Sequence, residues 1–297
     1  MSKISKDLLW KGIIKVLFNP FLHYFYKEYV DEIDFEKGFE FLDKELQTMY
    51  AQSDSKNRQA DLLVKVWLKN GKEKWILIHI EVQGYRDDEF SERVFNMYSR
   101  IRDRYGKPVS VLIIYTDDSP SFHPKEFRED CLGTVSHLQF STYKLLENPP
   151  SKSLDPDNPF SIVMEIAWYA LKKNKLSEEN YVSLGKEIVR KLIAKNFDHE
   201  TIRYVVEFLR HYVGFENSEL FGKFSEVIDN TLKIEKNMGI LEVIRKHKEE
   251  EIREDEIEKV IKNALDEGCT LDLIATITNL SIKEIKAIIK KNGWDKK

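Results

Sequence analysis

Residues 60–83 read ADLLVKVWLKNGKEKWILIHIEVQ, and this stretch decides the fold. Two runs rich in strand-forming residues flank Asn70-Gly71, a dipeptide that favours a tight turn between antiparallel strands. In the second run, every other residue from Ile76 to Val82 is apolar and suits a core. The opposite face of the same run ends with Glu81 and Gln83. A strand of buried type that finishes with a carboxylate and a carboxamide raises the question of what those two groups do.

The register of this hairpin can be predicted from its tryptophans. Aromatic residues facing each other across two strands form a favourable pair, so we expect Trp67 to pair with Trp75. In that register Asp61, where the first strand begins, falls opposite Glu81, with about 5 Å between the two Cβ atoms. Two facing carboxylates are unfavourable unless a cation lies between them.

A divalent metal ion could be the cation that lies between the two carboxylates. The carboxylates of Asp61 and Glu81, with the backbone carbonyl of Val82, are the hard oxygen ligands that Mg²⁺ prefers. Water held by such an ion can hydrolyse a phosphodiester, and Gln83 could orient that water or a phosphate oxygen. The pattern also allows a purely structural interpretation, in which Asp61 caps the strand and Glu81 pairs with Arg86.

The segments around the hairpin predict an α/β fold with a central sheet flanked by helices. Residues 87–105 have an apolar stripe at helical spacing, an acidic first turn and a basic last turn, as the helix dipole favours. The apolar run of residues 109–116 is typical of a strand buried on both faces. Further expected elements are a helix over 6–30 broken at Asn19-Pro20, a helix over 35–48, and a strand within 134–143.

The second half of the chain reads as helical. Residues 148–159 hold four of the eight prolines, which indicates a boundary between a domain of residues 1–150 and a helical domain of residues 151–262. Residues 263–297 predict a helix-turn-helix segment, with Thr270 and Ser281 as N-caps and Glu284 completing a capping box. The lysines of its last helix could contact DNA phosphates, although lysines also solvate most exposed helices.

Composition excludes several classes of protein. The net charge of −4 argues against a general polyanion binder, although it allows a local basic patch. The two cysteines, Cys131 and Cys269, form no CxxC pair and predict neither a zinc site nor a disulfide framework. Lys11 and Lys15 interrupt the most apolar N-terminal run, so we expect no signal peptide, no membrane span and a cytoplasmic location.

Several stretches together resemble the PD-(D/E)XK nuclease superfamily, and more closely the recombination-promoting nuclease (Rpn) family, also described as PD-(D/E)XK nuclease family transposases. Besides the hairpin stretch, the resemblance rests on DLLWKGIIKVLF, FLDKELQ, FSERVFNMYSRIRDRYGKPVSVLII and ALDEGCTLDLIATITNLSIKEI. It touches both ends and the middle of the chain, and its specific part is the hairpin. It implies a restriction-endonuclease-like core, with a central mixed sheet flanked by helices, followed by an all-helical C-terminal region.

The resemblance also assigns roles to residues. Asp61 matches the first metal-binding acid and Glu81 the second, whereas Gln83 occupies the position of the lysine in the superfamily name. Glutamine is usual there in the Rpn family, but it leaves the water-activating cation unassigned. Glu45 matches an acid on the first core helix that some members use near the metal, although it reads equally well as a surface acid.

Three basic residues are candidates for DNA contact. Arg93 and Arg100 lie on the polar stripe of the predicted helix 87–105, where they suit phosphate oxygens or a solvated helix face equally well. Lys65 shares the hairpin face of Asp61 and could replace the missing lysine charge, or simply be solvated.

The resemblance thus implies a Mg²⁺-dependent DNA endonuclease, with Mn²⁺ as a substitute metal, associated with DNA recombination or transposition. Because cutting both strands needs two sites, a homodimer is plausible. One alternative is a catalytically inactive DNA-binding or assembly protein with a relic nuclease core, which the near-neutral charge and the absent lysine favour. Another is a ribonuclease with the same metal chemistry.

Overall fold

The computed structural model describes residues 4–42, 62–70, 73–81, 89–153, 155–172, 178–213, 222–226, 228–229, 257–292 and 294. The chain divides into two compact units, Met1–Leu241 and Glu242–Lys297. The boundary predicted after residue 150 falls inside the first unit, and the one predicted after residue 262 falls inside the second.

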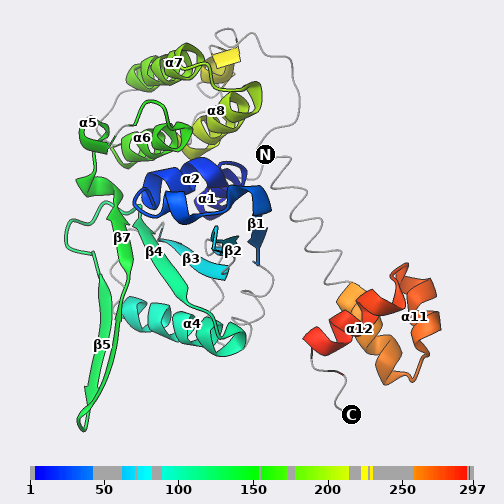
Figure 1. The fold of residues 1–297 in the computed structure, drawn as a ribbon. Coiled ribbons are helices and arrows are strands. Elements are labelled where there is room, and N and C mark those ends of the chain that lie inside the picture. Colours follow the sequence, from blue (N-terminus) through cyan, green and yellow to red (C-terminus); the bar gives the residue numbers. More distant parts are fainter. Residues whose placement is uncertain are drawn as a thin grey trace. The chain divides into compact units, whose positions relative to one another are not determined.

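A five-stranded mixed sheet forms the centre of the first unit (Figure 1). Its strands run in the order β1-β2-β3-β4-β7, and a separate two-stranded ribbon consists of β5 and β6. β1, β2 and β3 pair in antiparallel fashion, whereas β4 pairs in parallel with β3 on one side and with β7 on the other. The strands are β1 Phe39–Phe41, β2 Leu62–Trp67, β3 Glu73–Glu81, β4 Val109–Tyr115, β5 Glu126–Cys131, β6 Thr134–Gln139 and β7 Ser141–Lys144.

Helices cover both faces of this sheet (Figure 1). The α-helices of the first unit are α1 Lys6–Val16, α2 Phe18–Phe25, α4 Phe90–Tyr105, α5 Pro150–Ser153, α6 Pro159–Leu171, α7 Glu178–Ala194 and α8 His199–Val213. Short 3-10 helices are η1 Val30–Glu32, η2 Phe35–Lys37 and η3 Leu145–Glu147. The prediction of a mixed sheet flanked by helices is therefore confirmed. After residue 150, all the described secondary structure is helical, as the sequence predicted.

α4 covers one face of the sheet and connects the parallel strands β3 and β4. Its buried residues Val94, Met97 and Ile101 follow the apolar stripe of the sequence and pack against Leu63 of β2 and Ile113 of β4. Gly106, in the left-handed region at φ 60°, ends the helix and receives no penalty from a Cβ atom. The helix and strand predicted over 87–105 and 109–116 are thus confirmed within one to three residues.

α1 and α2 lie on the other face of the sheet and separate it from α6 and α8 (Figure 1). Phe18 of α2 packs edge-on against Phe39 and Phe41 of β1, with ring centroids 4.7 and 5.2 Å apart. Phe21 of α2 meets Phe160 of α6 at 5.1 Å. The later helices therefore bury apolar surface against the first two, which explains why residues 1–241 form one unit.

The structure corrects the prediction of a helix over residues 35–48 within its described part. Residues 35–37 form only the turn η2, and Phe39–Phe41 form β1. Gly38 at φ 70° stops helical continuation, and the alternating Phe39 and Phe41 pair with β2 instead. The predicted break at Asn19-Pro20 is also displaced. It falls at Leu17, because Pro20 lies in the first turn of α2, where its missing N–H group is not needed.

The hairpin β2–β3 is confirmed, but its predicted register is wrong by two residues. Trp75 pairs with Lys65, and Trp67 pairs with Glu73. Because the last pair of the ladder is Trp67 with Glu73, five residues of the sequence separate the two strands rather than the seven that a tryptophan pair would enclose. A shift of two residues keeps every side chain on its predicted face. It removes, however, the pairing argument that set Asp61 opposite Glu81.

The region around residues 126–144 also differs from the prediction of one strand. Phe140 separates two strands, of which β6 pairs with β5 and β7 joins the main sheet. The β5–β6 ribbon turns at Leu132 and Gly133, both with positive φ, and extends beyond α4 (Figure 1). Phe127 of the ribbon stacks on Phe95 of α4, with ring centroids 4.5 Å apart.

The second unit is a small helical assembly with its own core. Residues 257–266 are helical, followed by α11 Leu271–Thr278 and α12 Ile282–Lys291. Ile261, Ala264, Ile274 and Ile285 are buried together at its centre. Thr270 caps α11, and the predicted capping box of Ser281 and Glu284 is present at α12. In the described parts of both units, no helix combines the length and apolar character needed to cross a membrane.

Candidate functional site

Glu81 is the last residue of β3, which lies in the middle of the sheet. In the parallel register it pairs with Tyr115, the last residue of β4, and Tyr115 pairs in turn with Lys144 at the end of β7. The carboxyl ends of three parallel strands therefore meet at one edge of the sheet. Ligands of open α/β sheets bind at such an edge, outside the ends of the strands.

The other metal ligands and the glutamine predicted from the sequence lie outside the described residues. These are Glu45, Asp61, Val82 and Gln83, and for Glu81 the structure describes the backbone but not the side chain. Among the described residues, no group of three or more histidine, cysteine or acidic side chains could hold a metal ion. The metal site of Asp61 and Glu81 therefore stays a prediction.

Lys65 lies on β2, with its side chain largely covered. Its Nζ atom is 3.4 Å from Oε2 of Glu40 on the edge strand β1, and 4.6 Å from the ring centroid of Trp67. The ion pair with Glu40 and the cation–π contact with Trp67 are enough to explain why Lys65 lies in this position. Its predicted role in DNA contact is not tested by these contacts.

Arg93 and Arg100 both lie on α4, two turns apart. The Arg93 guanidinium lies 5.6 Å from the ring centroid of Phe90, in the first turn of the helix, and Arg100 is exposed. The N-terminal end of α4 follows β3 after eight residues, so the helix begins near the carboxyl ends of the strands. This end also carries the positive pole of the helix dipole, which attracts anions.

A buried ion pair lies at the same edge of the sheet. Nζ of Lys144 donates a hydrogen bond of 2.6 Å to Oδ1 of Asp117, and both side chains are fully buried. The backbone N–H of Ser119 donates to the same Asp117 oxygen at 3.0 Å, and Lys144 also donates to the carbonyl of Phe122. Within the described residues, Asp117 Oδ2 has no hydrogen-bond partner. Separating such a pair would leave an unpaired charge buried in the protein, which is strongly unfavourable.

Further contacts fix the loop that follows β4. Tyr115 donates a hydrogen bond of 2.6 Å from its hydroxyl to the carbonyl of Pro124. His123 lies 3.0 Å from the Thr142 hydroxyl and 3.4 Å from the Glu147 carboxylate. Burial lowers the pKa of His123, and this effect outweighs the opposite influence of Glu147. Hydrogen bonds that involve Asp117, Phe122 and His123 therefore connect the loop after β4 with β7 at this edge of the sheet.

Sequence reasoning missed Asp117 and Lys144. One signal was present, because Asp117 follows directly on the apolar run 109–116, at the end of a strand buried on both faces. Lys144, however, lies 27 residues further along the chain, at the end of a short strand that was not separated from β6. Nothing local marks it as the partner of Asp117.

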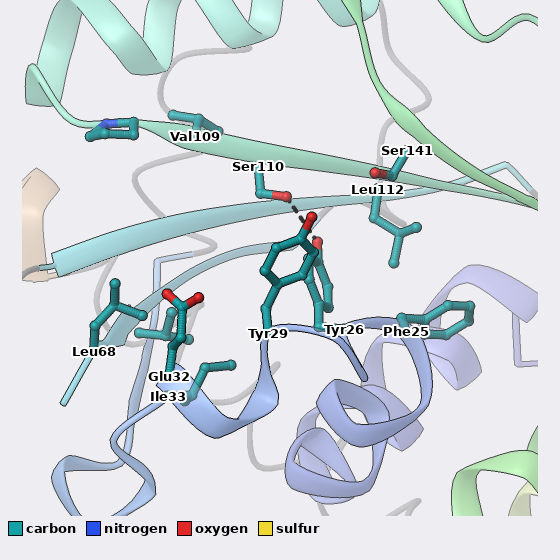
Figure 2. Close-up of a pocket in the computed structure, with 12 residues that line it drawn as sticks. Phe25, Tyr26, Tyr29, Glu32, Ile33, Leu68, Val109, Ser110, Leu112 and Ser141 are labelled. Atoms are coloured by element: carbon teal, nitrogen blue, oxygen red, sulfur yellow. Dashed lines mark hydrogen bonds between the residues drawn. The ribbon is translucent and has the colours of Figure 1, made fainter.

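A pocket of about 440 Å³ lies at the opposite end of β4 (Figure 2). Phe25, Tyr26 and Tyr29 form its aromatic wall, and Ser110 and Leu112 line it from the sheet. The hydroxyl groups of Tyr26 and Ser110 are 3.3 Å apart, and burial raises the pKa of Tyr26 to about 12. The lining is mostly apolar, with Glu32 as its charged residue, so its chemistry differs from that of the strand-end site.

Comparison with known proteins gives no match for this chain to a family model, a curated protein or a solved structure.

Proposed function

We propose that this protein is a metal-dependent DNA endonuclease of the PD-(D/E)XK type, related to the recombination-promoting nucleases. The observation that carries the proposal is the order of elements around Glu81. An antiparallel hairpin ends at this acid in the middle of the sheet, and a helix then crosses over to a parallel strand. A restriction-endonuclease-like core has the same order, with its second metal-binding acid at the same point.

The donor set suits the proposed cation. Asp61, Glu81 and the carbonyl of Val82 offer hard oxygen ligands, with Glu45 as a further acid, and Mg²⁺ prefers such ligands. When bound, Mg²⁺ or Mn²⁺ supplies charge stabilisation at the phosphate and lowers the pKa of a water molecule. Gln83 cannot carry a positive charge, so its part is to orient a water molecule or a phosphate oxygen by hydrogen bonds.

Two arginines of α4 supply positive charge for a polyanionic substrate at this edge, partly offset by Glu92 in the first turn of the helix. Arg93, in the first turn of α4, adds positive charge near the positive pole of the helix. Arg100, two turns further along α4, extends this charge on the exposed side. Both arginines are proposed to bind phosphate oxygens that flank the scissile bond, which orients the DNA without reading its sequence.

The test is nicking of a supercoiled plasmid by purified protein with Mg²⁺, Mn²⁺ or EDTA. We expect cutting that needs the metal and that falls at least 100-fold in Glu81→Ala and in Asp61→Ala, because each removes a proposed ligand. The matched control is Glu73→Ala, which removes a carboxylate from the other end of the same strand. It should cut like the wild type.

Three outcomes would overturn the proposal or part of it. Equal cutting by wild type and Glu81→Ala would locate the activity elsewhere. DNA binding without cutting in either metal would favour the inactive, DNA-binding protein with a relic core. Cutting of RNA but not of DNA would keep the metal chemistry and replace the substrate. A role in recombination, a cytoplasmic location and a homodimer that cuts both strands belong to the same proposal.

A further inference from the structure

The second unit has the order of elements and the short turn of a helix-turn-helix. α11 ends at Thr278, α12 begins at Ile282, and three residues connect them. Asn279 adopts the left-handed conformation at φ 58°, which an asparagine tolerates well, and Ser281 then caps α12. The helix of residues 257–266 completes a shared core through Ile261 and Ala264. Two helices joined by a turn of three or four residues are typical of this motif, and a third helix packs on them in its three-helix variants.

α12 has two chemically distinct faces. Ile285, Ile288 and Ile289 pack into the core of the unit. Lys283, Lys286 and Lys290 are exposed, and their spacing of three and four residues sets them on one face, opposite the isoleucines. The fold of the unit therefore presents a row of cations outward from its second motif helix.

The acid of α12 is engaged elsewhere. Oε2 of Glu284 accepts hydrogen bonds from the backbone N–H and the hydroxyl of Ser281, at 2.8 and 2.7 Å. These bonds lower the pKa of Glu284 and hold its charge at the first turn of the helix. It therefore does not lie among the three lysines. The helix of residues 257–266 differs, because its exposed Lys259 and Lys262 share it with three acids, Glu258, Asp266 and Glu267 of the adjoining turn.

We propose that this unit is a DNA-binding module that seats α12 in the major groove of duplex DNA. A helix of ten residues is about 15 Å long, and the major groove, about 12 Å wide, admits one helix. Lys283, Lys286 and Lys290 contact phosphates along the groove, and this contact is independent of the sequence. The module binds DNA without chemistry and does not depend on the nuclease proposal.

The experiment compares two matched pairs of substitutions in the full-length chain. One variant is Lys283→Ala/Lys286→Ala on α12, and the other is Lys259→Ala/Lys262→Ala on the helix of residues 257–266. Both remove two exposed lysines spaced three residues apart, and alanine keeps the helix propensity. Binding of a fluorescein-labelled duplex is followed by anisotropy in EDTA, which prevents metal-dependent cutting, between about 50 and 200 mM salt.

The α12 variant should bind roughly 10- to 60-fold more weakly at about 0.1 M salt, with the slope of log K against log salt reduced by about 1.8. The matched variant should bind within about twofold of the wild type. Equal losses in the two lysine variants, or no loss in either, would overturn the proposal. Displacement of the duplex by a minor-groove ligand but not by a major-groove ligand would overturn the groove assignment.

A further variant tests the alternative that the second unit binds a protein partner instead of DNA. Leu273, Ile277 and Ile282 are partly exposed apolar residues, with exposed fractions of 48, 56 and 37%. The DNA proposal expects Leu273→Ser/Ile277→Ser to retain duplex affinity within about twofold, because both substitutions lie on α11 and remove no cation. If this variant instead loses self-association while the α12 lysine variant retains DNA affinity, the surface binds protein and the proposal fails.

Discussion

At the scale of single residues, Tyr212 links three parts of the first unit. It belongs to α8, is 2% exposed, and its hydroxyl accepts a hydrogen bond of 3.2 Å from Trp10 Nε1 of α1. Its ring stacks on Phe208 at 4.7 Å. Burial raises the pKa of Tyr212 to about 12, and hydrogen bonds to Trp10 and Thr116 only partly oppose this. The hydroxyl is therefore held in its neutral form by the surrounding apolar side chains.

We predict that Tyr212 makes the folded state sensitive to alkali. Below pH 10 the tyrosine is protonated in the folded and the unfolded state, and its contribution to stability is complete. Between pH 10 and 12 the unfolded state ionises first, so the free energy of unfolding falls by about 3 kcal/mol as the pH passes through the folded pKa. Denaturant unfolding at a series of pH values measures this loss.

Tyr212→Phe provides the comparison. The variant should lose about 1 to 3 kcal/mol at neutral pH, because the indole N–H of Trp10 keeps no acceptor. Its stability should then decline less steeply than that of the wild type between pH 10 and 12. The remaining decline includes that of Tyr26, whose pKa is raised to the same value. Identical pH profiles for Tyr212→Phe and the wild type would contradict the assignment.

At the scale of elements, α7 packs closely against the helical residues 222–226. A Cβ atom on Gly185 would overlap Cε2 of Phe224, whose side chain is buried. Gly185→Ala should therefore destabilise the first unit by about 1 to 3 kcal/mol through overpacking, against the usual gain of alanine in a helix. Denaturant unfolding measures the change. In the control Gly222→Ala, the methyl group meets nothing within 4 Å, and a neutral or slightly stabilising effect is expected.

The elements that sequence reasoning predicted are those with a strong local pattern. The stripe of α4, the apolar run of β4 and the caps of α11 and α12 each contain their own signal within a few residues. β1 could not be predicted in this way, because the spacing of Phe35, Phe39 and Leu42 fits a helix equally well. Pairing with β2 decides the strand, and that is a long-range contact.

The candidate site also has parts that the sequence predicts and parts that it does not. A carboxylate at the end of a strand, as at Glu81, is visible in the sequence and is found at the end of β3. The hairpin register is not, because a shift of two residues preserves the face of every side chain and so leaves the hydrophobic pattern unchanged. The Asp117–Lys144 pair also depends on tertiary structure, since it joins the ends of two strands that only the sheet brings together.

At the scale of the whole molecule, the two units each have a core, and we predict that they unfold separately. Ile285 is fully buried at the centre of the second unit. Ile285→Ala should destabilise this unit by about 2 to 5 kcal/mol, because the substitution leaves a cavity. For a unit of this size such a loss is a large share of the total stability.

Scanning calorimetry of the full-length wild type and Ile285→Ala tests this prediction. The transition of the second unit should move to lower temperature or disappear, while that of the first unit stays within about 1 °C. A matched substitution in the first core, Ile113→Ala, should do the reverse. A single transition that both substitutions shift together would mean that the two units unfold as one.

The lengths of the outer strands have a consequence for the protein in concentrated solution. β1 and β7 form the two edges of the main sheet with three and four residues, so each offers only a short row of backbone groups. A second chain can add itself to a sheet only along such a row. Glu40 also puts a charge in the middle of β1. The sheet is therefore poorly suited to seeding fibrils, and aggregation of the native protein is expected to begin elsewhere on its surface.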